Sequence, residues 1–316
     1  MLSSFTIAFS NVLLTLLYII PGFLCRKTKV AKAEHLSTLS AILVYVCSPC
    51  MVVNSFMKTE RSPHMIGQIM LFFIVSLAIQ TVLTFILYGV FRKKFHDVKY
   101  RMLTVSFGLG NAGFFGIPII EALLPNRPEV ACFACVYIVG MNMLTFTIGA
   151  YCLTGDKKRM TLKKAFLNPP FISLIVALIL YALNVQSVTQ GNMLGNALEL
   201  LSKTTTPLCM IILGIRLASV SFKKLFTRIY VYVICACKLL VFPFVCLAIV
   251  YFLPLDPVFK AAMFILGGTP CAAVMLNIAE MYDGETELAA NCVLLSTLLC
   301  VFTIPLLNIV SDTLIL

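Results

Sequence analysis

The stretch SFGLGNAGFFGIPIIEALLP, residues 106–125, decides the fold of this chain. It begins a GxGxxG spacing at Gly108, which signals dinucleotide binding only where it lies between a strand and a helix of a βαβ unit. Here it lies in the middle of an apolar window at residues 102–124. The dinucleotide interpretation is therefore rejected, and the glycines must serve a different structural purpose.

Composition indicates a membrane protein. Of the 316 residues 60% are hydrophobic and 12% charged, with a mean hydropathy of +1.01, whereas soluble domains have about 25% charged residues. Ten windows are long and apolar enough to cross a bilayer as helices, so the fold class expected is an all-α polytopic membrane protein. The first window lacks the features of a signal peptide. The windows are 5–24, 36–57, 66–91, 102–124, 130–152, 169–186, 197–218, 228–252, 258–280 and 288–310.

The net charge of +11 comes mainly from every second loop. Eighteen of the 24 Lys and Arg residues follow odd-numbered windows, at residues 26–32, 92–101, 157–164 and 216–228. Because such an excess marks cytoplasmic loops, we expect a multi-pass plasma membrane protein with both termini extracytoplasmic. No nucleic acid partner is expected, because no basic run carries interleaved aromatic residues.

The sequence offers little for catalysis or metal binding. Nearly all of the 13 cysteines lie in apolar windows, where a thiol behaves as a small hydrophobe. The CSPC motif at 47–50 also lies inside a window, which disfavours redox chemistry. No shared metal site is expected from the three dispersed histidines, and no enzyme motif is present where chemistry is plausible. We therefore expect neither an enzyme nor a cofactor.

Glycines and a proline at membrane depth interrupt helical hydrogen bonding, which is tolerated only where protein or a water-filled cavity surrounds the break. They predict a discontinuous fourth helix, although close packing through small residues with a simple proline kink is an alternative. A second break is predicted in the ninth window, and paired breaks point to a transporter's binding site. The residues concerned are Gly108, Gly110, Gly113, Gly116 and Pro118 in the fourth window, and Gly267, Gly268, Thr269 and Pro270 in the ninth.

Matching prolines in the two halves indicate an internal repeat. Pro49 and Pro207 lie 158 residues apart, and Pro118 and Pro270 lie 152 apart. Two five-helix repeats fit these offsets, and because five is odd the second repeat is inverted. The divisions expected are 1–153 for the first repeat, 154–168 for a short cytoplasmic linker and 169–316 for the second repeat.

The chain resembles the auxin efflux carrier family, which contains the plant PIN-type auxin carriers and bacterial relatives assigned to organic acids. The resemblance rests on NAGFFGIP at 111–118, on Pro270 followed by AEMY at 279–282, and on GFLCRK at 22–27. It covers the whole chain, and the fourth-window motif is its most specific part. This chain is similar to the bacterial type, because only residues 153–168 stand where the plant carriers have a long regulatory loop.

The resemblance implies ten transmembrane helices, with spans one, two, six and seven as a scaffold and the others as a moving transport domain. It implies that helices four and nine cross near the midplane, with their breaks at Pro118 and Pro270, and Pro49 and Pro207 would be hinges of the scaffold. The ninth span departs from the pattern, having Val274 and Met275 in place of a second proline.

Polar residues at membrane depth suggest the substrate class. An unwound helix exposes backbone N–H groups and a positive dipole end, which favour an anion such as a carboxylate. Asn111 and Asn142 can donate hydrogen bonds to a substrate beside the break. The alternative is that their side chains only form hydrogen bonds between helices. Lys238 lies deep inside a window and 158 residues after Gln80, so this pair could compensate charge or couple transport to protons; a structural role is the alternative.

These inferences predict a secondary transporter for a small organic anion, auxin-like or a dicarboxylate, with efflux as the expected direction and a rocking or elevator movement. A bile-acid-type sodium symporter and a non-transporting membrane sensor are the alternatives. The expected partners are the organic anion and the lipid bilayer, with a homodimer left open.

The loop charges predict that residues 154 and 191 face opposite sides. Cysteines at Thr154 and Gly191, in a background without accessible thiols, should react with an impermeant thiol reagent from the cytoplasm and from outside, respectively. Labelling of both from one side would exclude the inverted repeat.

Overall fold

The computed structural model describes residues 2–32, 34–185, 191–219, 226–282 and 284–316. The first half contains α1 Leu2–Leu17, α2 Ile19–Lys27, α3 His35–Ile42, η1 Leu43–Cys47, α4 Ser48–Lys58, α5 Pro63–Phe91, η2 Arg92–Lys94, α6 Val98–Gly108, η3 Ala112–Gly116, α7 Ile117–Leu123, α8 Glu129–Leu144, η4 Thr145–Gly149 and α9 Ala150–Thr154. The second half contains η5 Lys157–Arg159, α10 Leu162–Phe166, α11 Pro169–Ala182, α13 Met193–Leu217, α15 Ile229–Ala236, η6 Cys237–Val241, α16 Phe242–Tyr251, α17 Pro257–Gly267, α18 Ala273–Met281 and α19 Thr286–Leu314.

The expected all-helical membrane class is confirmed. Of the ten expected spans, only some are found as long helices. Among the described residues, seven helical segments are long and apolar enough to cross a membrane. Three further windows contain shorter apolar helices, Ala112–Leu123, Pro169–Ala182 and Pro257–Gly267. Windows four and nine are shortened because each is interrupted by non-helical backbone, as the sequence predicted. The sixth window ends at Gln186, outside the described residues, so ten spans and their inversion stay predictions.

The basic loops meet at one end of the molecule, which we call the basic face. Arg26 donates to Ser219 Oγ over 3.1 Å, Lys164 donates to Tyr282 Oη over 2.6 Å, and Arg228 pairs with Glu287 over 2.7 Å. These contacts join the loops after α2, α9, α13 and α18. Lys223 and Lys224 lie outside the described residues.

Other loops meet at the opposite face. Tyr181 Oη donates to the Glu60 carbonyl over 2.7 Å, and Lys58 forms an ion pair with Glu199 over 3.2 Å. The helices therefore run between two faces of different charge, as the distribution of Lys and Arg along the sequence predicted.

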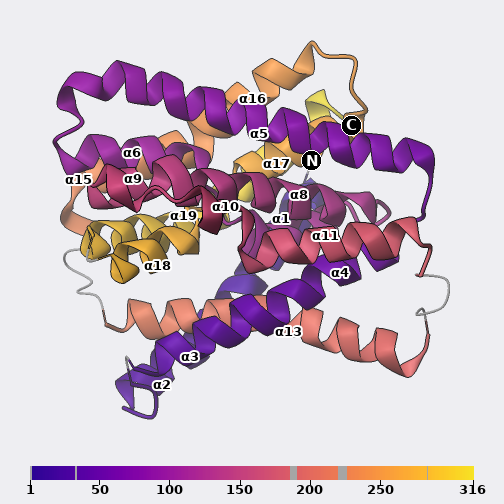
Figure 1. Ribbon diagram of the computed structural model, residues 1–316, viewed down its shortest axis with the longest axis horizontal. Helices are drawn as coiled ribbons and strands as arrows, with labels where there is room; N and C mark the ends of the chain where they lie inside the picture. The colour runs from indigo at the N-terminus through magenta and orange to yellow at the C-terminus, as the bar shows by residue number, and fades with distance from the viewer. Residues whose placement is uncertain (1, 33, 186–190, 220–225, 283) are drawn as a thin grey trace.

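Two groups of helices are visible in Figure 1. At the lower side of the view, α13 packs against α2 and α4, and α11 packs against α4 as well. Across the molecule, α5 packs against α8, and α16 packs against α17. α8 is buried along nearly its whole length. The first span does not stay within the lower group, because α1 packs extensively against α19.

Two glycines set the distance between α2 and α13. A Cβ atom at Gly22 would overlap the carbonyl oxygen of Ile211, and one at Gly214 would overlap the carbonyl oxygen of Ile19. The obstacle is backbone in both cases, so a side chain cannot be accommodated by a change of rotamer. Small residues allow this close backbone approach between membrane helices.

Gly214→Ala should therefore destabilise the protein by about 1–3 kcal/mol, the usual range for overpacking. The measurement is the thermal unfolding midpoint in detergent. Gly89→Ala in α5 is the matched control, because no atom lies within 4 Å of the added methyl group. Equal midpoints for the two variants would contradict the packing argument.

Candidate functional site

The broken helices meet in an antiparallel crossing. α6 ends at Gly108 and α17 ends at Gly267, and the residues that follow each of them, 109–111 and 268–272, are not helical. Asn111 N–H donates to the Pro270 carbonyl over 2.7 Å, and Ala272 N–H donates to the Leu109 carbonyl over 3.1 Å. Gly110 and Cys271 lie opposite each other in this bridge. Each break thus provides hydrogen-bond partners for backbone groups of the other, which lipid cannot do.

The first break lies within the predicted stretch from Gly108 to Pro118 but not at Pro118, where the resemblance placed it, and the second lies at Pro270 as expected. Pro118 lies in the first turn of α7 and inside the continuous helical segment Ala112–Leu123. A proline fits there because it follows the π-helical turn η3, where the regular i to i−4 hydrogen bonding of the helix is already interrupted. The first break instead spans residues 109–111. Pro270 does lie in the second break, where its carbonyl accepts from Asn111.

Close packing at the crossing accounts for the glycines. A Cβ at Gly110 would come within 2.9 Å of Lys238 Nζ, and one at Gly116 within 3.0 Å of the Thr269 methyl group. A Cβ at Gly268 would overlap the Leu307 side chain. Gly110, the middle glycine of the GxGxxG spacing, therefore allows the first break to lie against Thr269 of the second, whereas Gly108 and Gly113 lie against Thr84 of α5 and Ile138 of α8.

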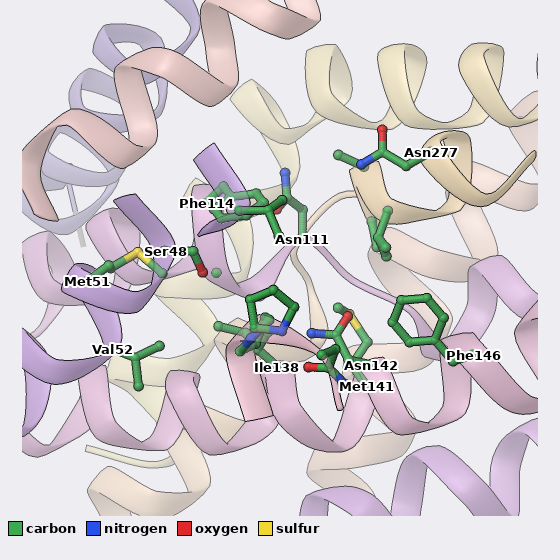
Figure 2. Close-up of a pocket in the computed structure, with 18 residues that line it drawn as sticks. Ser48, Met51, Val52, Asn111, Phe114, Ile138, Met141, Asn142, Phe146 and Asn277 are labelled. Carbon is green, nitrogen blue, oxygen red and sulfur yellow. The ribbon is translucent and has the colours of Figure 1, made fainter. Parts of the chain in front are cut away.

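A cavity of about 100 Å³ borders the crossing. Figure 2 shows Asn111, Asn142 and Asn277 around it, with Phe114 and Phe146. Asn111 lies in the first break, Asn142 on the buried helix α8 and Asn277 on α18. The Asn111 amide nitrogen is buried beside the Cys209 thiol. The cavity thus combines apolar walls with amide side chains, as ligand sites commonly do.

Helix beginnings also face this cavity. α18 starts at Ala273 without a side-chain cap, and its first residues Ala272, Ala273 and Val274 line the cavity. η3 starts after Asn111, again without a side-chain cap, and its Gly113 lines the same space. The first N–H groups of a helix lack intrahelical acceptors and carry the positive end of the dipole. The cavity therefore suits an anion.

A second cavity, of about 260 Å³, lies toward the opposite face. Its lining includes Lys58 and Lys203, together with Pro118 and Pro207. Met51 of α4 lines both cavities and is itself only 4% exposed. One buried side chain on α4 therefore lies between two spaces on either side of the crossing.

The predicted hinge prolines lie near a contact between α4 and α13. Pro49 is in the first turn of α4, directly after the π-helical turn η1, and Pro207 lies inside α13. Thr205 Oγ1 donates to the Cys47 carbonyl over 3.2 Å. The structure thus brings the two prolines to neighbouring helices, and a hinge function stays a prediction.

Lys238 lies at the crossing and not in the cavity. It is fully buried in the π-helical turn η6, and its Nζ donates to the Gly267 carbonyl over 2.8 Å. The ammonium also lies 4.4 Å from the centre of the Phe242 ring. Gly267 is the last residue of α17, so Lys238 places a positive charge at the negative end of that helix.

Gln80 is buried near the first break. Its backbone carbonyl would lie 3.7 Å from a Cβ at Gly108, and neither polar atom of its side chain has a hydrogen-bond partner among the described residues. The structure therefore places Gln80 beside the end of α6, whereas Lys238 contacts the end of α17. Charge compensation and proton coupling by this pair stay predictions.

Sequence reasoning missed Arg216 and Asn277. Arg216 belongs to the basic run at 216–228 in the sequence, yet it is 7% exposed and donates to Asn277 Oδ1 over 2.9 Å. Asn277 follows Ala273 by one helical turn, and both line the cavity. That spacing after the predicted break was the available signal. Val274, where the chain departs from the family pattern, also lines the cavity.

Comparisons with known proteins agree with this architecture. The membrane transport protein family matches residues 7–155 and, separately, residues 153–308. An uncharacterised transporter of Methanothermobacter thermautotrophicus is 24% identical over 304 residues, covering 95% of this chain and 97% of its own length. An uncharacterised transporter of Methanocaldococcus jannaschii is 22% identical over 300 residues, covering 93% and 96%.

The Lys238 contact can be tested by removing the donor. Lys238→Met should lower stability by about 1–3 kcal/mol, because it leaves the buried Gly267 carbonyl without a partner, whereas Lys238→Gln keeps an N–H group and should lose less. Thermal unfolding in detergent measures the difference. Lys260→Met is the matched control, because Lys260 also donates to a helix-end carbonyl, that of Tyr251 over 2.9 Å, but near the surface. A Lys238→Met midpoint no lower than that of the control would rule out the structural role.

Proposed function

Because this chain belongs to the membrane transport protein family, we propose that it is a secondary transporter that moves a small organic anion across the plasma membrane. An auxin-like monocarboxylate or a dicarboxylate is the proposed substrate, and efflux is the proposed direction. The proposal rests chiefly on one observation: two helix beginnings without side-chain caps, together with Asn111 and Asn142, line a single cavity at the crossing.

Charge supports the choice of an anion. The cavity receives the positive ends of η3 and α18, while the negative end of α17 is occupied by Lys238. No Asp or Glu is among the described residues that line this cavity. A carboxylate can accept hydrogen bonds from backbone N–H groups and from Asn111 and Asn142 at the same time. Apolar walls from Met141, Phe114 and Phe146 suit the carbon skeleton of an organic acid.

The two cavities support alternating access. Both lie between helices of the expected scaffold, such as α4, and parts of the expected transport domain, such as η3 and α7. Met51 on the scaffold side separates them. Movement of the broken helices past α4 would close one cavity as it opens the other, which is the rocking or elevator movement proposed here.

The two separate family matches support a repeat. Each covers a stretch that contains five of the ten apolar windows, and the two breaks pair antiparallel. We therefore retain the division into 1–153, 154–168 and 169–316, the inverted ten-span topology and the basic face as cytoplasmic. A homodimer stays a prediction.

Proteoliposome transport tests the function. Purified protein should move at least one radiolabelled carboxylate from a panel of acetate, malonate, succinate, citrate and indole-3-acetate, with proton and sodium gradients imposed separately to identify any driving ion. Asn111→Ala should lower the rate at subsaturating substrate about tenfold or more, the usual effect of losing a hydrogen bond to a charged group.

Asn308→Ala is the matched control. Asn308 is equally buried, at 4% exposure, but its amide donates to the Ser4 carbonyl at the contact between α19 and α1. This variant should transport as the wild type does. A wild-type protein inactive toward the whole panel would refute transport of these acids, whereas an active Asn111→Ala variant would refute only the site.

A further inference from the structure

Arg216 is a buried cation with a spare donor. It lies near the end of α13 with 7% of its side chain exposed, and its Nη2 donates both to Asn277 Oδ1 over 2.9 Å and to Glu280 Oε2 over 3.0 Å. Its Nε is buried and has no hydrogen-bond partner in the described part of the chain. A guanidinium can present two parallel N–H groups to one carboxylate, and Glu280 uses only one nitrogen. The hydrogen-bonding capacity of Arg216 is therefore incompletely used.

The ion pair is unequal in its access to water. The Glu280 side chain is 46% exposed, while Arg216 is almost completely covered. A buried cation needs an anion nearby, since the unpaired charge costs several kcal/mol, but an exposed carboxylate can return to water at little cost. The counter-ion of Arg216 can therefore be exchanged, provided that another carboxylate replaces it.

Arg216 lines a small cavity that adjoins the cavity at the crossing. A small cavity of about 20 Å³ is lined by Arg216, Cys209 and Asn277, which is room for about one water-sized group. Val44, Phe114, Ala273 and Asn277 line both this cavity and the 100 Å³ cavity. The two spaces therefore adjoin, with Phe114 and Asn277 at their boundary. Both Asn277 and Glu280 belong to α18, the helix whose beginning faces the larger cavity.

We propose that Arg216 and Asn277 form a carboxylate-binding subsite at the basic-face entrance of the transport site, in which Glu280 is an internal counter-ion that an incoming carboxylate displaces. This inference rests on the proposed function, since it assumes that the transported molecule is an organic anion. The incoming carboxylate binds the Nε and Nη2 side of Arg216, and Glu280 moves into water. The net charge around the guanidinium is unchanged by the exchange, so its burial is preserved.

A purely structural ion pair between α13 and α18 predicts different behaviour. In that case Glu280 is needed for its own contact, and replacing both partners by neutral amides restores the protein, as it often does for buried pairs. In the subsite, Glu280 competes with the substrate and Arg216 is required. The double variant Arg216→Gln/Glu280→Gln therefore separates the two roles.

Transport kinetics from the basic face provide the test, using the panel carboxylate that the wild type moves fastest. Arg216→Gln should raise KM about ten- to a hundredfold, and the double variant should remain equally impaired. Glu280→Gln should lower KM, because the competing carboxylate is gone. Arg216→Lys keeps the charge but lacks the two parallel N–H groups of a guanidinium. Its KM should therefore lie between those of Arg216→Gln and the wild type. Arg228→Gln, which removes a basic-face cation from the Arg228–Glu287 pair, is the matched control and should keep the wild-type KM.

Thermal unfolding in detergent gives a second readout that needs no transport. Glu280→Gln leaves Arg216 without its counter-ion, so the same carboxylate should raise its unfolding midpoint more than that of the wild type. Arg216→Gln should stay folded, because the Glu280 side chain is already half exposed and does not need a buried partner. Binding of the carboxylate to this subsite should no longer raise the unfolding midpoint of this variant.

The outcomes distinguish the subsite from the proposed function. Wild-type KM in the double variant, or a raised KM in Glu280→Gln, would show a structural ion pair and overturn the subsite while transport stands. A wild type that neither moves nor is stabilised by any panel carboxylate would overturn the proposed function and the subsite with it.

Discussion

The two backbone hydrogen bonds between the broken helices, from Asn111 to Pro270 and from Ala272 to Leu109, are the constraint on which the rest of the structure depends. Non-helical backbone at membrane depth leaves polar groups that lipid cannot satisfy, at a cost of several kcal/mol each. Pairing the breaks antiparallel lets each supply donors and acceptors to the other. It also requires the two breaks to lie close together, which accounts for glycine at 110, where an added Cβ would lie 2.5 Å from Thr269 Oγ1 of the second break.

The crossing also gives the negative and positive ends of the broken helices different surroundings. The negative end of α17 is held by the buried ammonium of Lys238, whereas the positive ends of η3 and α18 face the 100 Å³ cavity without side-chain caps. Buried Lys238 therefore neutralises one end of the broken pair and leaves the other available. The cavity gains positive potential without a Lys or Arg among the described residues of its lining, so an anion can bind there without forming a tight ion pair that would hinder its release.

The sequence was sufficient to predict the membrane class, the family resemblance that the family match confirms, and the existence of two breaks, because glycine and proline clustered inside an apolar window weaken a continuous helix. The first break lies in the predicted stretch from Gly108 to Pro118, but the resemblance placed it at Pro118, and only the pairing of Gly110 with Cys271 fixes its position at residues 109–111. Arg216 was missed because loop cations and buried cations near a helix end look alike in sequence. Arg216 is buried because α18 folds back over α13. Its hydrogen-bond partners on α18, Asn277 and Glu280, follow it in the sequence by 61 and 64 positions.

Met51 is the physical link between the crossing and the proposed movement. A Cβ at Gly113 would lie 3.8 Å from the Met51 Cε atom and 2.8 Å from Ile138, so a flexible side chain on α4 that lines both cavities lies beside the start of η3. Methionine is unbranched and adapts to irregular spaces, which would let this contact persist during the proposed movement. The paired breaks are joined by two backbone hydrogen bonds, so in that movement η3 and α18 would travel together. The cavity beside Asn111 and the ion pair of Arg216 with Glu280 would then change together, and closure of the proposed substrate site would accompany exposure of its proposed entrance.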